Sequence, residues 1–458
     1  MTLIKSISGI RGTIGGKINE NLTPLDVVLF TASYAAWCKQ HVNKENIIVV
    51  VGRDARISGE MIKNLIINTL VACGANVIDI GLATTPTTEM AVMGEHADGG
   101  IIVTASHNPA QWNALKLLNH RGEFLSAADG ASVLELSNNL SFEFAKIHQL
   151  GQIITKDYLD YHIQKILALP LVTPTEIKSA NLKVVVDAIN SVGAMAIPAL
   201  LKQLGVNDII LLNSEINGQF AHNPEPLDEH LSQIKQTVVE NHAHLGIVVD
   251  PDVDRLAFIC EDGTMFGEEY TLVAVADYVL SHTQGNTVSN LSSSRALDDI
   301  SAKFNSQCFH SAVGEVNVVQ MMKEKNAVIG GEGNGGVIYP DLHYGRDALV
   351  GVALFLSYFT KKGLSMSQLK ATYPQYYMVK HKINLQPGFN FNIIKEKIET
   401  TIPYQSKSTI DGLRLDFADG WVHIRPSNTE PIIRLYAEAP NKEKAWNHVN
   451  KILKIISN

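Results

Sequence analysis

The sequence predicts an α/β protein: three consecutive α/β domains with mixed, mostly parallel sheets, followed by a small C-terminal α+β domain. Three observations support this prediction. The chain has 458 residues, which is too long for one hydrophobic core and predicts about three or four domains. Short apolar segments alternate with helical patterns as far as about residue 372, as in βαβ units. Beyond that point the pattern changes to separated strands.

Six apolar segments are the expected strands of the first two domains: residues 47–51, 77–80, 101–103, 184–186, 209–212 and 247–249. The alternation starts again after about residue 153 and after about residue 256. In the last domain we expect strands at residues 412–417 and 421–424 and a helix from Lys442 onward. The expected domains are therefore residues 1–153, 154–255, 256–372 and 373–458.

The composition is typical of a globular protein. Hydrophobic residues make up 45% and charged residues 18% of the chain. The formal net charge of −8 argues against nucleic acid or an anionic membrane as the main partner. No apolar stretch approaches about 18 residues and the start resembles no signal peptide, so we expect a cytoplasmic location. The four cysteines are scattered, which predicts reduced thiols, and the sequence does not indicate an oligomeric state.

A serine follows the expected strand at residues 101–103. The strand leads directly into Thr104-Ala-Ser106-His107-Asn108-Pro109. In open α/β sheets, ligands bind beyond the carboxyl ends of the strands, so this position presents Ser106 to a ligand. We interpret Ser106 as a nucleophile, and the alternative is an ordinary Ser/Asn/Pro turn.

Three aspartates follow the expected strand at residues 245–249. Asp250, Asp252 and Asp254 stand at alternate positions, and such clustered carboxylates raise one another's pKa unless a cation lies among them. A hard divalent metal with oxygen ligands is the natural occupant, which suggests phosphoryl chemistry. An EF-hand is excluded because Arg255 stands where that loop requires glycine. A dehalogenase-type phosphatase would have Thr or Val in place of Asp254, and a solvated acidic turn remains the alternative.

A glycine-rich segment at residues 331–336 matches the pattern G-x-G-x-x-G. The segment Val337-Ile-Tyr-Pro340 follows it instead of a helix, and no acidic residue stands about twenty positions further on. A dinucleotide site is therefore rejected. The segment remains a loop in which Glu332 and Asn334 are suited to bind sugar hydroxyls.

A polar segment near the C-terminus combines groups that bind anions. Residues 425–434 contain Arg425, Ser427, Asn428, Thr429 and Arg434, and turn backbone N–H groups add further donors. Such a set can hold a phosphate by bidentate and backbone hydrogen bonds. The alternative is a polar hairpin between two strands.

These four segments, with Ser8-Gly-Ile-Arg-Gly12, resemble the α-D-phosphohexomutase superfamily, in the family's order and over essentially the whole chain. The family's phosphoserine, metal, sugar and phosphate loops match Ser106 and residues 250–255, 331–335 and 425–431. The resemblance implies a central cleft between the domains. It also implies a Mg²⁺-dependent phosphohexomutase that uses hexose 1,6-bisphosphate as intermediate and activator. One departure is Gly336, because many members have histidine directly after the sugar loop.

The resemblance also implies roles for individual residues. The expected catalytic residues are Ser106, His107, Lys116 and Arg255. The expected metal ligands are Ser106, Asp250, Asp252 and Asp254. The expected substrate-binding residues are Arg11, Glu332, Asn334, Arg425, Ser427, Asn428, Thr429 and Arg434.

Alternatives remain open for the less certain members of this set. His107 contacts phosphate or substrate, or else braces its loop. Lys116 transfers protons or stabilises charge, or else is a solvated helix lysine. Arg11 and Arg255 contact phosphate or sugar, or else form ion pairs with Asp54 or the metal loop.

The resemblance implies that the substrate is a sugar phosphate. Glucosamine phosphate is the first choice because Ser-Gly-Ile-Arg-Gly resembles phosphoglucosamine mutases. The alternative is a phosphoglucomutase/phosphomannomutase, whose phosphate loop is similar to Arg-Pro-Ser-Asn-Thr-Glu-Pro. A phosphatase and a non-catalytic sugar-phosphate sensor are the rival classes. Without an imidazole at residue 336, we expect relaxed choice among hexoses.

Overall fold

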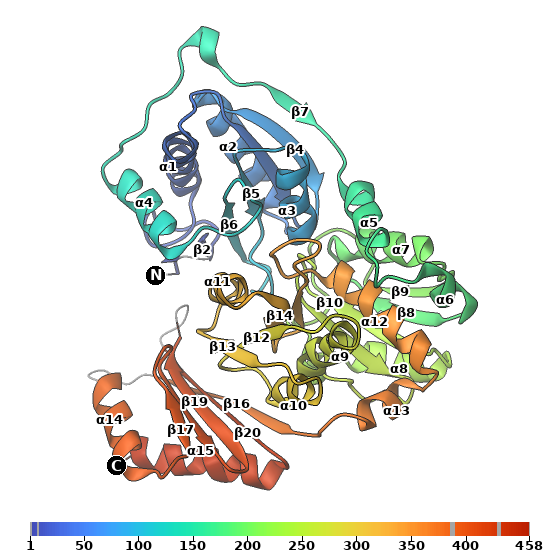
Figure 1. The fold of residues 1–458 in the computed structure, drawn as a ribbon. Coiled ribbons are helices and arrows are strands. Elements are labelled where there is room, and N and C mark those ends of the chain that lie inside the picture. Colours follow the sequence, from blue (N-terminus) through green and yellow to red (C-terminus); the bar gives the residue numbers. More distant parts are fainter. Residues whose placement is uncertain (1, 7–8, 385–389, 428–431, 458) are drawn as a thin grey trace.

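The computed structural model describes all residues except 1, 7–8, 385–389, 428–431 and 458. It contains four sheets, one for each stretch of chain that was expected to form a domain (Figure 1). The three N-terminal sheets are mixed, with parallel strands at their centres, and the fourth is antiparallel. The predicted fold class is confirmed.

The first domain has a seven-stranded sheet of order β1-β2-β6-β5-β3-β4-β7. Its strands are β1 (Ile4–Ser6), β2 (Gly9–Thr13), β3 (Ile48–Arg53), β4 (Asn76–Leu82), β5 (Gly99–Val103), β6 (Trp112–Leu118) and β7 (Ile153–Thr155). Its helices are α1 (Pro24–Val42), α2 (Gly59–Ala72), α3 (Thr85–Gly94) and α4 (Ala127–Asn138). Side chains of α1 and α2 pack on one face of the sheet, and those of α3 pack on the other.

The second domain has the sheet order β11-β10-β8-β9. Its strands are β8 (Lys183–Asp187), β9 (Asp208–Leu212), β10 (Leu245–Val249) and β11 (Leu256–Cys260). Its helices are α5 (Leu159–Leu167), α6 (Pro174–Ser179), α7 (Gly193–Gln203) and α8 (Ser232–Glu240). Because β11 pairs with β10, the boundary expected between residues 255 and 256 would divide one sheet, and we place it after β11 instead.

The third domain has the sheet order β13-β12-β14-β15. Its strands are β12 (Asn286–Asn290), β13 (Cys308–Ser311), β14 (Ala327–Glu332) and β15 (Gly336–Ile338). Its helices are α9 (Glu268–Leu280), α10 (Ala296–Lys303), α11 (Glu315–Lys325), α12 (Ala348–Lys362) and α13 (Met366–Ala371). One continuous apolar core joins this domain to the second.

The fourth domain has the sheet order β16-β20-β19-β18-β17 and a separate apolar core. Its strands are β16 (Tyr377–Asn384), β17 (Ser406–Ser408), β18 (Leu413–Phe417), β19 (Gly420–Pro426) and β20 (Ile432–Ala439). Two helices, α14 (Phe391–Thr401) and α15 (Lys442–Ser457), lie beside the sheet (Figure 1). The terminal helix begins at Lys442, as predicted.

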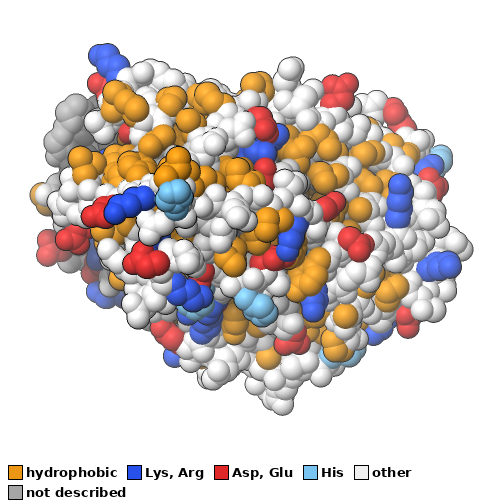
Figure 2. All heavy atoms as spheres, turned by 90° about the horizontal axis from the view of Figure 1, so that it is seen from above, with side chains coloured by type: hydrophobic (Ala, Val, Ile, Leu, Met, Phe, Trp, Pro, Cys, Tyr) orange, Lys and Arg blue, Asp and Glu red, His pale blue; other side chains and the backbone are white. Residues whose placement is uncertain are grey.

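The charged side chains on the surface and the hydropathy of the helices can be compared with the expectations from the sequence. The face seen in Figure 2 has acidic and basic side chains interspersed among hydrophobic and uncharged ones. Among the described residues, no helix has the length and apolar character needed to cross a membrane.

Candidate active site

Ser106 lies just beyond the end of β5, in a loop that a buried arginine holds in shape. Its backbone has φ +48°, a left-handed conformation that few non-glycine residues adopt. The guanidinium of Arg56 donates hydrogen bonds to the carbonyl oxygens of Ser106 (2.5 Å), Asn108 (2.6 Å) and Pro109 (2.8 Å). Asp54 pairs with Arg56 at 3.1 Å. The sequence analysis did not identify Arg56.

The serine hydroxyl meets the three aspartates that follow β10. Ser106 Oγ donates to Asp250 Oδ2 at 2.7 Å, although 144 residues separate them. One carboxylate oxygen from each of Asp250, Asp252 and Asp254 lies within 4.8 Å of the others, and all three residues are buried. Burial, then Asp252 and Asp254, raises the pKa of Asp250 well above its usual range.

The triad has spare ligand atoms. Asp252 Oδ1 and Asp254 Oδ1 are buried and have no hydrogen-bond partner. Leaving such oxygens unpaired is costly, and a cation would satisfy them. The triad can therefore bind a metal ion.

Lys116 lies in β6 and points to the triad. Its Nζ donates to Asp252 Oδ2 at 2.7 Å and lies 3.5 Å from Asp254 Oδ2. Burial lowers its pKa, but Asp252 and Asp254 outweigh this effect and raise it, so the amine is charged. The alternative of a solvated helix lysine is wrong, because the side chain is buried and the segment is a strand.

His107 contacts the serine that precedes it. Its Nδ1 lies 3.3 Å from Ser106 Oγ, so the turn permits a contact between these neighbours. Burial and the charges of Arg255, Arg11 and Arg346 hold the pKa of His107 well below its usual range. The imidazole is therefore neutral.

Glu332 lies at the end of β14, where the β14–β15 turn begins. Its carboxylate accepts hydrogen bonds from Asn290 Nδ2 (2.7 Å), Gly314 N (3.1 Å) and Arg346 Nη1 (3.0 Å). Burial raises its pKa, but Arg346 and Asn290 outweigh that effect and lower it. Asn334 stays within the turn and its Nδ2 lies 3.4 Å from Glu332 Oε2.

Arg346 joins the metal loop to the sugar loop, and the sequence analysis missed it. Its guanidinium binds Asp254 (2.7 Å), Glu315 (2.9 Å) and Glu332 (3.0 Å). A Cβ atom at residue 336 would lie 2.3 Å from Cδ of Arg346, so this arginine fills the space that Gly336 leaves open. The sequence pointed to such an arginine only indirectly: Asp254 and Glu332, in two predicted site loops, need a counter-charge when they are buried.

Two further predicted arginines lie in this region. Arg255 Nη1 binds Glu225 at 3.1 Å, and Arg255 Nε is buried with no hydrogen-bond partner. Arg11 Nη1 lies 3.5 Å from Asn108 Oδ1, in the loop that carries Ser106. Burial, then the charge of Arg255, lowers the pKa of Arg11. The crowding of these cations indicates a site for an anion.

The predicted phosphate loop connects β19 to β20. Arg425 and Arg434 face one another in the register of these strands, and Ser427 N donates to Ile432 O at 2.9 Å. Arg425 is buried, and burial lowers its pKa. The predicted residues Asn428 and Thr429 lie outside the described residues.

Family models match nearly the whole chain. Alpha/beta/alpha domains I, II and III of phosphoglucomutase/phosphomannomutase match residues 4–143, 156–263 and 267–377, and the C-terminal domain matches residues 386–454. The chain belongs to the phosphoglucomutase/phosphomannomutase family. It is a phosphohexomutase, an isomerase that transfers a phosphoryl group.

Relatives of this family in archaea match along their full length. A phosphoglucomutase/phosphomannomutase from Thermococcus kodakarensis is 36% identical over 450 residues, covering 97% of this chain and 98% of the relative. A phosphoglucosamine/phosphogalactosamine mutase from Sulfurisphaera tokodaii is 32% identical over 456 residues, covering 98% of each chain.

Solved phosphohexomutase structures share the fold. A phosphoglucomutase/phosphomannomutase family protein from Burkholderia thailandensis has TM-score 0.85 at 25% identity, covering 99% of this chain and 96% of that one. The Aspergillus fumigatus N-acetylphosphoglucosamine mutase, solved with GlcNAc-6P and magnesium, has TM-score 0.60 at 14% identity, covering 100% of this chain and 96% of that one.

Proposed function

We propose that this phosphohexomutase interconverts hexose 6-phosphate and hexose 1-phosphate through phosphorylated Ser106 and a hexose 1,6-bisphosphate, most readily with glucosamine phosphate. The observation that carries the proposal is the 2.7 Å contact between Ser106 Oγ and Asp250, within a buried triad that has two unpaired carboxylate oxygens. A phosphoryl group on Ser106 would lie at the triad. Sugar phosphates are then the partners, and the cytoplasm is the proposed compartment.

The donor set fits magnesium. Asp250, Asp252 and Asp254 offer only carboxylate oxygens, which Mg²⁺ prefers, and a phosphoserine oxygen would complete the set. When bound, Mg²⁺ would offset the negative charge that develops on the transferring phosphoryl group. The Aspergillus mutase solved with magnesium supports this choice.

In the proposed transfer, a sugar hydroxyl attacks the phosphorus of phosphoserine 106. A bond forms between the sugar oxygen and phosphorus, the bond from phosphorus to Ser106 Oγ breaks, the sugar hydroxyl gives up its proton, and Ser106 Oγ takes up one. His107 Nδ1 lies 3.3 Å from Ser106 Oγ and is placed to exchange the proton of that leaving oxygen. Lys116 is charged and stabilises the transferring group instead.

The bisphosphate must then turn over, so that its other phosphate returns to Ser106. Arg425, Ser427 and Arg434, with Asn428 and Thr429 of the same loop, hold whichever phosphate is not reacting. Glu332 and Asn334 hold the ring hydroxyls in both orientations. Arg11 and Arg255 add positive charge near the reacting phosphate. Free hexose 1,6-bisphosphate would act as activator because it rephosphorylates Ser106.

Intact-mass spectrometry tests the phosphoserine. Wild-type protein incubated with glucose 1,6-bisphosphate should gain one phosphate that maps to Ser106. Ser106→Ala should gain none and lose steady-state activity, whereas Ser132→Ala, an exposed serine in α4, should behave as wild type. A phosphate on another residue, or near wild-type turnover by Ser106→Ala, would show that the nucleophile is wrong.

The alternative substrates, glucose and mannose phosphates, are tested by comparing kcat/KM. Because no side chain at residue 336 selects a hydroxyl, the values for glucosamine, glucose and mannose 6-phosphates should lie within about two or three decades of one another. Preference for glucose or mannose phosphate would establish the alternative. One sugar favoured by more than about 10⁴-fold would point to a dedicated selecting residue.

A further inference from the structure

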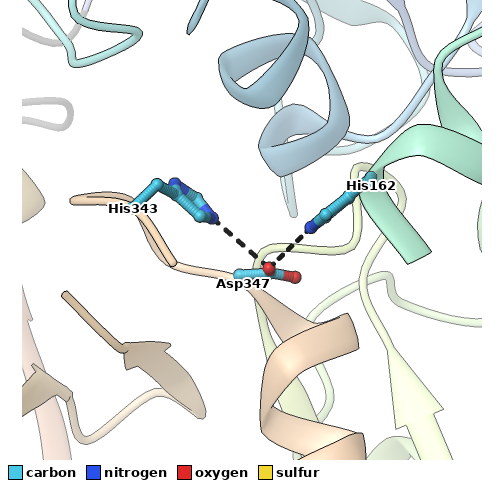
Figure 3. Close-up of side chains that lie close together, drawn as sticks. All are labelled: His162, His343 and Asp347. Carbon is cyan, nitrogen blue, oxygen red and sulfur yellow. Dashed lines mark hydrogen bonds and ion pairs between the residues drawn. The ribbon is translucent and has the colours of Figure 1, made fainter. Parts of the chain in front are cut away.

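A buried cluster of two histidines and an aspartate lies where the first three domains meet. His162 belongs to α5, His343 precedes α12, and Asp347 caps the start of α12. The Nε2 atoms of His162 and His343 lie 3.0 Å and 3.3 Å from Asp347 Oδ2 (Figure 3). One ligand atom from each residue lies within 4.8 Å of the others, and all three residues are buried.

The second polar atom of each of these side chains lies close to another polar group, by hydrogen bonds for His162 and Asp347 and at ion-pair distance for His343. His162 Nδ1 lies 3.0 Å from Thr87 Oγ1, and His343 Nδ1 lies 3.3 Å from Glu89 Oε2. Asp347 Oδ1 accepts hydrogen bonds from the first backbone N–H groups of α12 at 2.8 Å and 3.3 Å. Metal-binding histidines typically contact a carboxylate or another polar group through their other ring nitrogen, which fixes the tautomer that coordinates.

Two buried carboxylates lie beside these imidazoles, Asp347 within the cluster and Glu89 next to it. Both oxygens of Glu89 lack a hydrogen-bond partner, and His343 Nδ1 lies 3.3 Å from one of them. Buried carboxylates need a counter-charge. Without a metal, a protonated His343 supplies it, and a divalent cation bound to two neutral imidazoles would balance both carboxylates.

We propose that His162, His343 and Asp347 bind a zinc ion, with Thr87 and Glu89 orienting the two imidazoles. Two imidazoles and one carboxylate suit Zn²⁺, whereas the all-oxygen set of Asp250, Asp252 and Asp254 suits Mg²⁺. The contacts of 3.0 Å and 3.3 Å are near the spacing of about 3.3 Å between ligands placed 2.0–2.1 Å from a tetrahedral ion. Water would supply the fourth ligand.

The ion would act on the architecture behind the active site. Helix α3 supplies Thr87 and Glu89 to the cluster, and Thr85 of the same helix donates to Asp252 Oδ2 at 2.7 Å. Asp347 directly follows Arg346, which binds Asp254 and Glu332. A zinc ion would therefore hold α3, α5 and α12 in one arrangement and stabilise the folded protein. This proposal does not depend on the proposed reaction.

The first test is the zinc content of full-length protein that is stripped with a chelator, incubated with Zn²⁺ and desalted. Asp252→Asn protein, with its Mg²⁺ triad weakened, should retain one equivalent. The double variants Asp252→Asn/His162→Gln and Asp252→Asn/His343→Gln should lose it, and their melting temperature should no longer rise when Zn²⁺ is added. Zinc that persists in these double variants, or that is absent from Asp252→Asn, would overturn the proposal.

A second test needs no change to the cluster. X-ray absorption of the zinc bound to Asp252→Asn protein should show two imidazole ligands, and a spectrum with oxygen ligands alone would overturn the proposal.

A third test concerns Glu89. Adding Glu89→Gln to Asp252→Asn should weaken zinc affinity by about 10–100-fold, because the carboxylate that orients the His343 imidazole is lost. The matched control Asp252→Asn/Glu135→Gln, which changes a glutamate of α4 instead, should bind zinc as Asp252→Asn does. Equal affinity in the Glu89 and Glu135 variants would contradict the role of Glu89.

Discussion

Two junctions of the molecule are held together differently. The second and third domains share one apolar core, in which α9 packs against β11 and α12 packs against α6 and α7. The fourth domain has its own core and meets the third through hydrogen bonds. Examples are Arg414 Nη1 to Leu291 O at 2.8 Å, Ser292 Oγ with His423 Nδ1 at 2.8 Å, and Arg295 N to Glu438 at 2.9 Å.

The two junctions differ in how easily they open, and the residues of the reaction centre and those proposed to bind the phosphate lie on opposite sides of the polar junction. Opening an apolar junction costs about 25 cal/mol for each Å² exposed, whereas a hydrogen bond exchanged for water costs about 1 kcal/mol. Ser106, the aspartate triad, Lys116 and Arg346 all lie on the first three domains. The residues proposed to bind the phosphate lie on the fourth domain. The proposed bisphosphate must be bound in two orientations. A rigid reaction centre and a phosphate-binding loop that moves at a small free-energy cost would allow this.

The largest expected effect is on the rate of the reaction and concerns the metal site in the first three domains. Asp252→Asn should lower kcat by about 10³-fold or more, because a metal ligand and the charge that pairs with Lys116 are lost together. Steady-state rates across a Mg²⁺ titration measure the effect, and circular dichroism checks folding. Undiminished wild-type activity in excess EDTA would contradict the metal site.

Arg346→Met should destabilise the protein by about 3–5 kcal/mol, because it leaves Asp254 and Glu332 as buried carboxylates without their shared cation. Urea unfolding measures the loss. The control Arg121→Met removes an exposed partner of Glu123 and should cost less than about 1 kcal/mol. If the two variants lost equal stability, Arg346 would not be the link between the metal and sugar loops.

Arg425→Ala should affect binding more than chemistry. Losing charge-assisted hydrogen bonds to the non-reacting phosphate costs about 1.5–3 kcal/mol, or roughly 10–150-fold in KM, with a smaller change in kcat. Initial rates over a range of hexose 6-phosphate concentrations separate the two constants. A fall in kcat with KM unchanged would place Arg425 in the chemical step instead.

The last prediction concerns the pH dependence of stability at the polar junction between the third and fourth domains. Burial lowers the pKa of His423 from 6.5 to about 4. Between those values the unfolded chain binds a proton that the folded protein does not, so stability falls as pH drops from 6.5 towards 4. Melting temperatures of wild type and His423→Gln should converge across this window, because the variant lacks this proton-linked loss. Parallel curves would show that His423 does not titrate there.

The sequence predicted the strand ends well because the signal was local. An apolar run followed by polar residues located Ser106 and the three aspartates, and the structure brings them together. Lys116 was assigned a role only through a resemblance, because β6 did not stand out as a strand. Arg56 and Arg346 escaped notice because the contacts that bring them to the site, with Ser106 and Asp254, join residues 50 and 92 positions apart in the chain. Periodicity carries no information about such distant ion pairs.

Gly336 and Arg346 form one steric unit. A side chain at residue 336 would meet Arg346 at 2.3 Å, and Arg346 cannot move away without releasing Asp254 and Glu332. A variant with a large residue at 336 therefore needs a shorter side chain at 346 and another counter-charge for both carboxylates, so the two positions have to be changed together.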